Sequence, residues 1–341
     1  MTDDVSQFLS GLGWQPFFAD QCADTQADLA PMRVATVHRT KITALDATGQ
    51  GRLTLPPQAN TAHFAVGDWV LVEPETRLLV RRLERKALLQ RRLDGGTHQL
   101  IAANVDTLFL VTSCNDDFNP ARLERYLALA NEAGTRPVIV LSKADKIADA
   151  AQFLERARDL QRGLEVVSLN AKDPQAAQTL GPWCGPGQTV ALVGSSGVGK
   201  STLLNTLASK TGADAQLTGG IREGDAKGRH TTTSRSLHAI TGGGWVIDTP
   251  GMRTLHVSDV ADGLDVLFAE IVELAPHCRF RDCTHAHEPG CAVQAAIANG
   301  SLDPERVERW RKLQTENTTN TPVQTGPRGN KIAQKSFKKR R

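Results

Sequence analysis

An eight-residue segment of this 341-residue chain carries the residue types that hold phosphate groups. It reads Gly194-Ser195-Ser196-Gly197-Val198-Gly199-Lys200-Ser201 and is followed by Thr202. Glycines at these spacings let backbone N–H groups wrap a phosphate chain, the lysine reaches the β- and γ-oxygens, and the serine gives Mg²⁺ an oxygen ligand. An apolar strand precedes the segment, and the helix that follows adds a favourable potential at its N-terminus. The sequence therefore predicts a nucleoside triphosphate site here, with Lys200 assisting catalysis and Ser201 binding magnesium.

A second motif typical of phosphate chemistry, Asp248-Thr249-Pro250-Gly251, follows an apolar strand expected over 245–247. In nucleoside triphosphatases an acid at this position holds Mg²⁺ through water, and the glycine responds to the γ-phosphate. We assign these roles to Asp248 and Gly251. Between the two motifs, Gly228-Arg229-His230-Thr231-Thr232-Thr233 offers a hydroxyl for Mg²⁺. Thr232 is favoured for that role, with its neighbours as close alternatives.

Residues that could recognise a base follow another expected strand, over 137–141, and read Ser142-Lys143-Ala144-Asp145. A carboxylate at Asp145 can accept both N–H donors of guanine, and the stem of Lys143 can pack along the ring. Adenine offers no such pair of donors, so GTP is favoured over ATP. Ser142 stands where asparagine is commoner, but its hydroxyl could still tie neighbouring loops together. Residues 168–171 would be the remaining base-contacting loop.

Three of the six cysteines, Cys278, Cys283 and Cys291, fall within fourteen residues and have His285 interleaved. Three thiolates and one imidazole make a closed tetrahedral zinc site. Disulfides are the alternative, but three cysteines leave one unpaired and a cytosolic setting disfavours them. On spacing alone, His277 and His287 are possible substitutes for the histidine ligand. The other cysteines are scattered and predicted to be ordinary thiols.

The elements that would position these residues change character along the chain. From residue 32 to about residue 93 the sequence is alternating and interrupted by turns, as is typical of short strands. The clearest strands are expected at 33–37, 41–45, 51–55 and 67–72. Strands at this spacing predict a small β-barrel. Basic residues along its last strands make an oligonucleotide-binding barrel a candidate, although a purely structural barrel needs fewer assumptions.

From about residue 100 strands alternate with helices, which predicts a doubly wound α/β domain. Asn119-Pro120 supplies an N-cap and a first-turn proline for a helix that stops at Gly134. Strands are expected at 105–112, 137–141, 166–167 and 189–193, with another helix near 148–162. After about residue 257 helical sequence surrounds the cysteine cluster. The last residues have the composition of a disordered segment.

The net charge is only +3, but basic residues are concentrated in two segments. Residues 326–341 carry seven basic side chains and no acid, and residues 77–92 carry seven against Glu84 alone. Such patches suit a polyanion, although a basic tail can also serve only solubility. The apolar runs are too short to span a bilayer, and acids stand where a signal peptide needs basic charge. These features predict a cytoplasmic protein without membrane contact.

The motifs occur in an unusual order, because the guanine motif at 142 precedes the phosphate loop at 194. An ordinary GTPase has the reverse order, so the chain resembles a circularly permuted one. With a barrel before it and a cysteine cluster after it, the chain resembles the ribosome small subunit-dependent GTPase A (RsgA) family. The resemblance covers nearly the whole chain and rests on Gly67-Asp68-Trp69-Val70, Ile101–Asp106, Asp117–Asn119, Arg122–Tyr126, the phosphate loop and Gly228–Thr233.

This resemblance implies a multidomain protein whose zinc ligands include His285. The expected parts are an irregular N-terminal segment (1–31), an OB-fold-like barrel (32–96), a circularly permuted α/β P-loop GTPase domain (97–257), a helical zinc-binding domain (258–314) and a disordered basic tail (315–341). The family also implies binding to the 30S ribosomal subunit and 16S rRNA in late 30S maturation, with GTP hydrolysis driving release. We expect a monomer.

Slow intrinsic turnover is predicted, because Met252 stands where many GTPases carry a glutamine that positions the attacking water. His230 is a candidate to orient that water or to contact a partner, although a histidine in a polar loop is often incidental. Its place in the Gly-x-His-Thr-Thr-Thr motif of the family favours the catalytic role. The alternatives are an RNA-binding assembly scaffold with incidental turnover, and a P-loop ATPase, which Asp145 disfavours.

Overall fold

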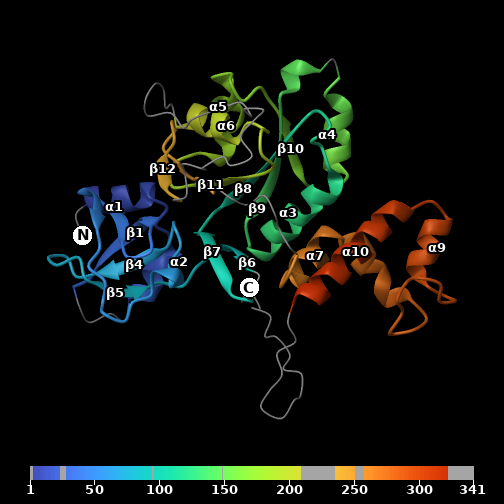
Figure 1. Cartoon of the computed structure of the whole chain (residues 1–341), viewed down its shortest axis with the longest axis horizontal. Coiled ribbons are helices and arrows are strands. Elements are labelled where there is room, and N and C mark those ends of the chain that lie inside the picture. The colour runs from blue at the N-terminus through green and yellow to red at the C-terminus, as the bar shows by residue number, and fades with distance from the viewer. Residues whose placement is uncertain are drawn as a thin grey trace, which may run out of the picture. The chain divides into compact units, whose positions relative to one another are not determined.

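The computed structural model describes residues 3–23, 28–93, 96–147, 149–208, 235–249 and 257–321. The chain divides into two compact units, Met1–Leu255 and His256–Arg341 (Figure 1). Within the described ranges, no helix combines the length and apolar character needed to cross a bilayer.

The first unit begins with two short helices, α1 (Asp3–Gly11) and α2 (Pro16–Ala19). The prediction of an irregular segment over residues 1–31 is therefore wrong for these residues. Leu9, Leu12 and Phe18 are each 2% exposed or less and pack in one cluster with Trp69. The apolar side chains are too few for a strong helical pattern in isolation, and burial against the neighbouring sheet stabilises the helices.

Five antiparallel strands follow and form a sheet in the order β3-β2-β1-β4-β5. They are β1 (Ala30–Val37), β2 (Ile42–Asp46), β3 (Gly49–Arg52), β4 (Trp69–Val72) and β5 (Leu79–Arg82). We call this the N-terminal sheet. Beyond β3, the amide of Thr54 donates to the Arg77 carbonyl (2.9 Å) and the Leu79 amide donates to the Thr54 carbonyl (2.9 Å). This isolated parallel bridge connects the two edges of the sheet.

Strands β6 (Leu88–Arg92) and β7 (His98–Ala103) pair with each other in a separate two-stranded sheet. The predicted barrel domain reaches residue 96 and so includes β6, which pairs outside the five-stranded N-terminal sheet. The run of basic and apolar residues over 79–92 looks continuous in the sequence. The structure interrupts it at residues 83–87, which belong to no strand and include Arg85, whose side chain forms a buried ion pair.

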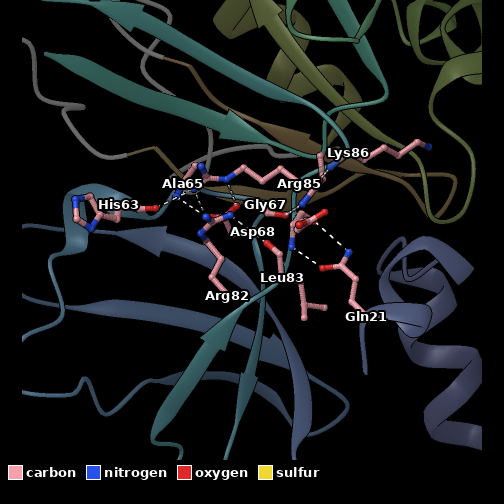
Figure 2. Close-up of polar contacts among 11 residues, drawn as sticks. Gln21, His63, Ala65, Gly67, Asp68, Arg82, Leu83, Arg85 and Lys86 are labelled. Carbon is pink, nitrogen blue, oxygen red and sulfur yellow. Dashed lines mark hydrogen bonds and ion pairs between the residues drawn. The ribbon is translucent and has the colours of Figure 1, made fainter. Parts of the chain in front are cut away.

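That ion pair joins Arg85 to Asp68, whose side chain is fully buried (Figure 2). Arg85 Nε donates to Oδ1 of Asp68 (2.7 Å) and Nη2 donates to Oδ2 (2.8 Å), in the bidentate geometry of a strong charge-assisted contact. The Ala65 amide also donates to Oδ2 (2.8 Å), and Arg85 Nη2 reaches the His63 carbonyl (2.9 Å). The buried carboxylate is thus neutralised and hydrogen-bonded, as burial of a charge requires.

The α/β part of the first unit has a six-stranded sheet in the order β10-β9-β8-β11-β13-β12. Its strands are β8 (Thr107–Ser113), β9 (Arg136–Ser142), β10 (Glu165–Ser168), β11 (Thr189–Val193), β12 (Leu237–Ala239) and β13 (Trp245–Ile247). All neighbours are parallel except β12, which pairs antiparallel with β13. The associated helices are α3 (Pro120–Glu132), α4 (Ala151–Arg158), α5 (Gln175–Thr179) and α6 (Lys200–Leu207).

Both faces of this sheet are covered, as the doubly wound prediction requires. Phe109 and Val111 belong to one core with Leu203 of α6, whereas the alternating residues Leu108 and Leu110 are equally buried on the other face. The strands β8, β9 and β10 all precede the phosphate-loop strand β11 in the chain, and in the sheet β8 lies beside β11 with β9 and β10 further out. The sheet therefore has the strand sequence of a circular permutation.

The second unit contains the helices α7 (Ala261–Leu267), α8 (Ala269–Leu274), α9 (Ala292–Ala298) and α10 (Pro304–Asn320). Helix α10 runs six residues beyond residue 314, where the predicted tail begins. Its polar end is held by hydrogen bonds rather than by apolar packing. Oδ1 of the buried Asn317 accepts from the Val260 amide (3.2 Å), and Glu316 accepts from the Val257 amide (3.1 Å). Residues 322–341 of the predicted tail lie outside the described residues.

Candidate functional site

The phosphate loop connects β11 to α6, as the sequence predicts. Gly194 has a φ of +147°, and a side chain there would bring its Cβ to 2.1 Å from the Val111 carbonyl oxygen. Gly199 has a φ of +96° and directly precedes the helix. Only glycine fits these positions without strain, because one needs a close backbone approach and the other a left-handed conformation.

The cationic and hydroxyl groups of the loop lie at the start of α6. Lys200 Nζ donates to the carbonyls of Gly194 (2.9 Å) and Ser195, so the ammonium group lies over the loop itself. Ser201 and Thr202 are half-buried in the first helical turn. Ser196 and Gly197 are exposed at the tip of the loop. The arrangement offers N–H groups, one cation and two hydroxyls to an anion.

The base motif lies directly beside this loop. Ser142 ends β9 and is fully buried, and its Oγ lies 2.6 Å from the Val198 carbonyl oxygen and 3.0 Å from that of Thr112. A hydroxyl has one proton, so the shorter contact is the stronger hydrogen bond. Lys143 follows with a φ of +57°, and Asp145 lies in a 3₁₀ turn over Ala144–Lys146. The serine hydroxyl thus links the base loop to the phosphate loop.

A third loop, over residues 168–171, meets the other two. The Leu169 amide donates to the Leu141 carbonyl (2.9 Å), and Thr206 of α6 donates its hydroxyl to the Ala171 carbonyl (2.8 Å). All three loops leave the carboxyl ends of parallel strands. This edge of an open α/β sheet is the usual place for a ligand.

Asp248 follows β13, the strand next to β11. Its amide donates to the Ser236 carbonyl (3.2 Å), and the neighbouring Thr249 is buried with its hydroxyl donating to the Leu192 carbonyl. The acid therefore sits at the same sheet edge as the phosphate loop. Gly251, His230 and Thr232, which the sequence analysis selected with these residues, lie outside the described residues.

The cysteine cluster forms a compact donor set in the second unit. The ligand atoms of Cys278, Cys283, His285 and Cys291 all lie within 4.8 Å of one another. The two sulfurs of Cys278 and Cys291 are 3.8 Å apart, and His285 Nδ1 lies 3.4 and 3.5 Å from them. Tetrahedral zinc with Zn–S bonds of about 2.3 Å needs a sulfur–sulfur separation of roughly 3.8 Å. The residues present fit zinc, with His285 as the histidine.

The surroundings of His285 and Cys278 favour the protonation states that bind a metal, whereas burial raises the pKa of the Cys283 thiol. Burial lowers the pKa of the His285 imidazole, which keeps the ring neutral. Burial raises the pKa of the Cys278 thiol, but hydrogen bonds from the Ala292 and Val293 amides and from neighbouring thiols bring it below its ordinary value. The Gln294 amide donates to the sulfur of Cys291 (3.4 Å), which is the N-cap of α9. A thiolate ligand here also caps a helix.

Helix α10 and a carboxylate hold the loop of the cluster in place. His285 has a φ of +59°, and its carbonyl accepts hydrogen bonds from Gln294 Nε2 (2.6 Å) and from Arg311. Glu288 accepts from the amides of Thr284 (2.9 Å) and Ala286 (3.0 Å). These contacts fix the loop conformation that brings the histidine to the sulfurs.

Two of the basic residues expected to face a polyanion have internal partners. Arg85 is held by Asp68, as described above, and Arg77 pairs with Asp46 (3.5 Å) and Thr48 (3.2 Å). The sequence shows the charge of these arginines but not the acids that the fold brings to them. The basic segment over 77–92 is thus partly structural.

Comparison with known proteins decides the family. The model of the RsgA GTPase family matches residues 82–258. A small ribosomal subunit biogenesis GTPase RsgA of Mesorhizobium japonicum is 66% identical over 327 residues, which cover 96% of this chain and 94% of that protein. The chain belongs to the RsgA GTPase family.

Other members extend the similarity across most of the chain. Small ribosomal subunit biogenesis GTPase RsgA 2 of Vibrio vulnificus is 48% identical over 323 residues, which cover 94% of this chain and 91% of that protein. The crystal structure of YjeQ from Thermotoga maritima superimposes with a TM-score of 0.63 at 27% identity, over 84% of this chain and 98% of that one. A structure described as YloQ, a circularly permuted GTPase, has a TM-score of 0.60 at 24% identity and shares the fold. The circularly permuted GTPase fold is confirmed.

Sequence reasoning missed the residues that connect this RsgA GTPase site to the N-terminal sheet. Strand β12 was not predicted, and neither was the role of Ser236, whose carbonyl meets the Asp248 amide. A three-residue strand gives almost no periodic signal. Residues 67–70 were expected only as part of a strand, and residues 101–106 were noted for the family resemblance; the contacts of Gly67 and Asn104, described below, were not predicted.

Proposed function

We propose that this protein is a GTPase stimulated by the small ribosomal subunit, that it binds the 30S subunit and its 16S rRNA late in maturation, and that hydrolysis drives release. The observation that carries the proposal is the 66% identity, over nearly the whole chain, to a protein named for small ribosomal subunit biogenesis. The convergence of a base loop and a phosphate loop at one sheet edge supports the nucleotide part.

The nucleotide roles follow from the chemistry of the side chains. Asp145 recognises guanine with Lys143 along the ring, and Ser142 fixes that loop to the phosphate loop. Residues 194–202 bind the phosphates, with Lys200 on the β- and γ-oxygens. Ser201 ligates Mg²⁺ directly, and Asp248 reaches it through water.

Turnover needs groups from the loop that carries His230 and Thr232. The chain has Met252 where many GTPases carry a glutamine. A thioether cannot orient the attacking water molecule, so another group must do so. We infer that Thr232 is the second magnesium ligand and that His230 orients the attacking water once a partner is bound. Gly251 responds to the γ-phosphate.

The N-terminal sheet is proposed to be an oligonucleotide-binding barrel. Its strand order and the bridge between Thr54 and Leu78 at its two edges support closure. Allowing for β6 and the two N-terminal helices, the proposed domains are the barrel (32–96), the permuted GTPase domain (97–257), the zinc-binding helical domain (258–314, extended to the end of α10) and the basic tail. The zinc domain holds one structural Zn²⁺ on Cys278, Cys283, His285 and Cys291. We infer a monomer that works in the cytoplasm, where its ribosomal target is assembled.

The test is steady-state phosphate release from GTP, measured alone, with purified 30S subunits and with 50S subunits. Stimulation by 30S alone is expected, and His230→Ala should then reduce the stimulated rate much more than GTP affinity. Tight GTP binding without stimulation by either subunit would contradict the proposal. That outcome would favour a scaffold in which the nucleotide only sets the conformation.

A further inference from the structure

We propose that the N-terminal sheet positions Asp248 through the strand pair β12–β13. A partner that binds and displaces that sheet would therefore change the rate of GTP hydrolysis. The inference rests on the GTPase reaction and on the subunit stimulation proposed above, and it names the residues that connect the two. Ser236, Trp245 and Ile247 are the positioning residues. None of them belongs to the phosphate, base or zinc motifs.

The first connection is a bridge between backbones. Thr36 of β1 pairs with Ser236, the residue before β12, in an isolated antiparallel bridge. The Ser236 carbonyl in turn accepts a hydrogen bond from the Asp248 amide (3.2 Å). Two consecutive contacts therefore lead from the N-terminal sheet to the acid that we assign to the magnesium site.

The second connection is the close approach of Gly67 to β13. A Cβ at Gly67 would lie 3.1 Å from Cδ1 of Ile247 and 2.2 Å from the Ala103 carbonyl oxygen, and the φ of Gly67 is +92°. The backbone just before β4 thus lies close to the side chain of Ile247, the residue immediately before Asp248. A glycine is needed here because there is no room for a side chain.

The third connection fixes the other end of β13. Trp245 Nε1 donates to the Gly11 carbonyl (2.8 Å), and its ring packs on the cluster of Leu12, Phe18 and Trp69. Strand β13 is only three residues long. Both of its ends are therefore held by the N-terminal part of the chain.

Buried polar contacts surround Gly67 on the side of the N-terminal sheet, beginning with Asp68 and Arg85 (Figure 2). Asp68 and Arg85 form the buried ion pair next to Gly67, and Asn104 Nδ2 donates to the Gly67 carbonyl (3.0 Å). Asn104 Oδ1 accepts from the Lys86 amide (2.8 Å). Arg33 is fully buried and donates to the Leu12 carbonyl. A buried network of this kind resists local deformation, so the sheet and its contacts on β13 move together.

Small displacements of Asp248 should matter, because misplacement of a catalytic group by about 1 Å can cost 10²-fold in rate. If the sheet biases the position of Asp248, the nucleotide must bias the sheet by the same free energy, since binding linkage is reciprocal. The connection can therefore be tested from both directions.

The experiment compares two double variants of the full chain. Trp245→Phe with Ile247→Val removes the indole donor to Gly11 and the Cδ1 methyl against Gly67, and keeps an aromatic and a β-branched residue. Trp183→Phe with Ile139→Val makes the same chemical changes elsewhere in the α/β part, at the 3₁₀ turn Gly181–Trp183 and in β9. There the indole donates to Glu165 (3.0 Å), and Ile139 is fully buried in β9.

Two measurements are made on both variants and the wild type. The first is amide exchange of residues 34–37 with GDP and with a non-hydrolysable GTP analogue, in the absence of any partner. The second is kcat and KM for GTP with and without 30S subunits. We expect the first variant to lose the exchange response and about fivefold or more of the stimulated kcat, with KM within about twofold, and the control to match the wild type.

Equal responses of the two variants in both measurements would overturn the proposal. If the wild type is not stimulated by 30S subunits, the proposed function fails, and the exchange comparison still decides whether the sheet and Asp248 are coupled. A general loss of stability would appear in both variants alike, so it cannot imitate the expected difference.

Discussion

At the scale of single residues, the hydroxyl of Ser142 shows how a side chain shorter than asparagine can connect neighbouring segments. The hydroxyl of Ser142 lies within hydrogen-bonding distance of carbonyls from two other segments, at Val198 and Thr112. Because the residue is fully buried, water cannot replace these contacts. The sequence predicted that a hydroxyl could tie loops together, but it could not say which carbonyls the hydroxyl would meet.

Replacing Ser142 with alanine should weaken guanine nucleotide binding several-fold and lower the free energy of unfolding by about 1–2 kcal/mol, because a buried carbonyl loses its donor. Fluorescence titration with a labelled nucleotide and urea unfolding measure the two effects. Thr135→Val is the matched control, since Thr135 is buried just before β9, at the end of that strand opposite to Ser142, and bonds the Ala130 carbonyl (3.0 Å). An equal loss of nucleotide affinity in the control would refute the role given to Ser142.

The buried thiol of Cys184 should make stability fall at high pH. Burial raises its pKa from the ordinary value of 9.0 to about 12, so the folded state keeps a proton that the unfolded state has lost. The contribution is fully present below pH 9 and is lost as the pH rises towards 12, at up to about 1.4 kcal/mol per pH unit. Urea unfolding between pH 8 and 11 should show a shallower decline for Cys184→Ala than for the wild type, and identical slopes would count against this cause.

At the scale of elements, the sequence correctly predicted the helix cap and the loop that are stabilised by contacts between neighbouring residues. Asn119 was expected to cap α3, and its Oδ1 accepts from the Arg122 amide (2.9 Å). The phosphate loop was located between its strand and helix for the same reason. The errors fall on α1, the pairing of β6 with β7, strand β12 and the end of α10. For α1 and the end of α10, distant packing or a polar side chain such as Asn317 supplies the stability, and no short window of sequence contains both partners.

Zinc and helix α9 should be lost together, because Cys291 is both a ligand and the cap of that helix. Cys278→Ser should abolish bound zinc and expose the amides of 278–298 to exchange, while GTP affinity stays within about twofold since the nucleotide site lies in the other unit. Metal analysis and amide exchange give the readouts. Cys22→Ser, outside the cluster, should retain one zinc per chain. Retention of zinc by Cys278→Ser would disprove the assigned ligand set.

At the scale of the whole molecule, charge is distributed differently from what the sequence alone suggests. Arg77 and Arg85 pair with acids inside the first unit, which leaves the tail from 326 to 341 as the densest basic segment without an acid of its own. We therefore expect the tail's share of the salt dependence of subunit binding to exceed its share of the chain length.

Changing the seven basic residues of the tail to glutamine should weaken 30S binding at low salt. It should also reduce the slope of log K against log salt by about 0.7–0.9 for each phosphate group that the tail no longer neutralises. Binding is measured by sedimentation at several salt concentrations. GTP affinity, measured in parallel, should not change. A slope identical to that of the wild type would assign the tail to solubility alone.

The order of strands in the sheet also has a consequence for synthesis. Strands β10, β9 and β8 form one continuous half of the sheet and are made before β11, β12 and β13. During translation, the base loop at Ser142 can be complete while the phosphate loop has not yet left the ribosome. Until β11 arrives, β8 is an uncovered edge, which is open to pairing with other chains. We expect nucleotide capture to be the last event in making this domain, and chains cut short before residue 189, where β11 begins, to depend on chaperones to stay unaggregated.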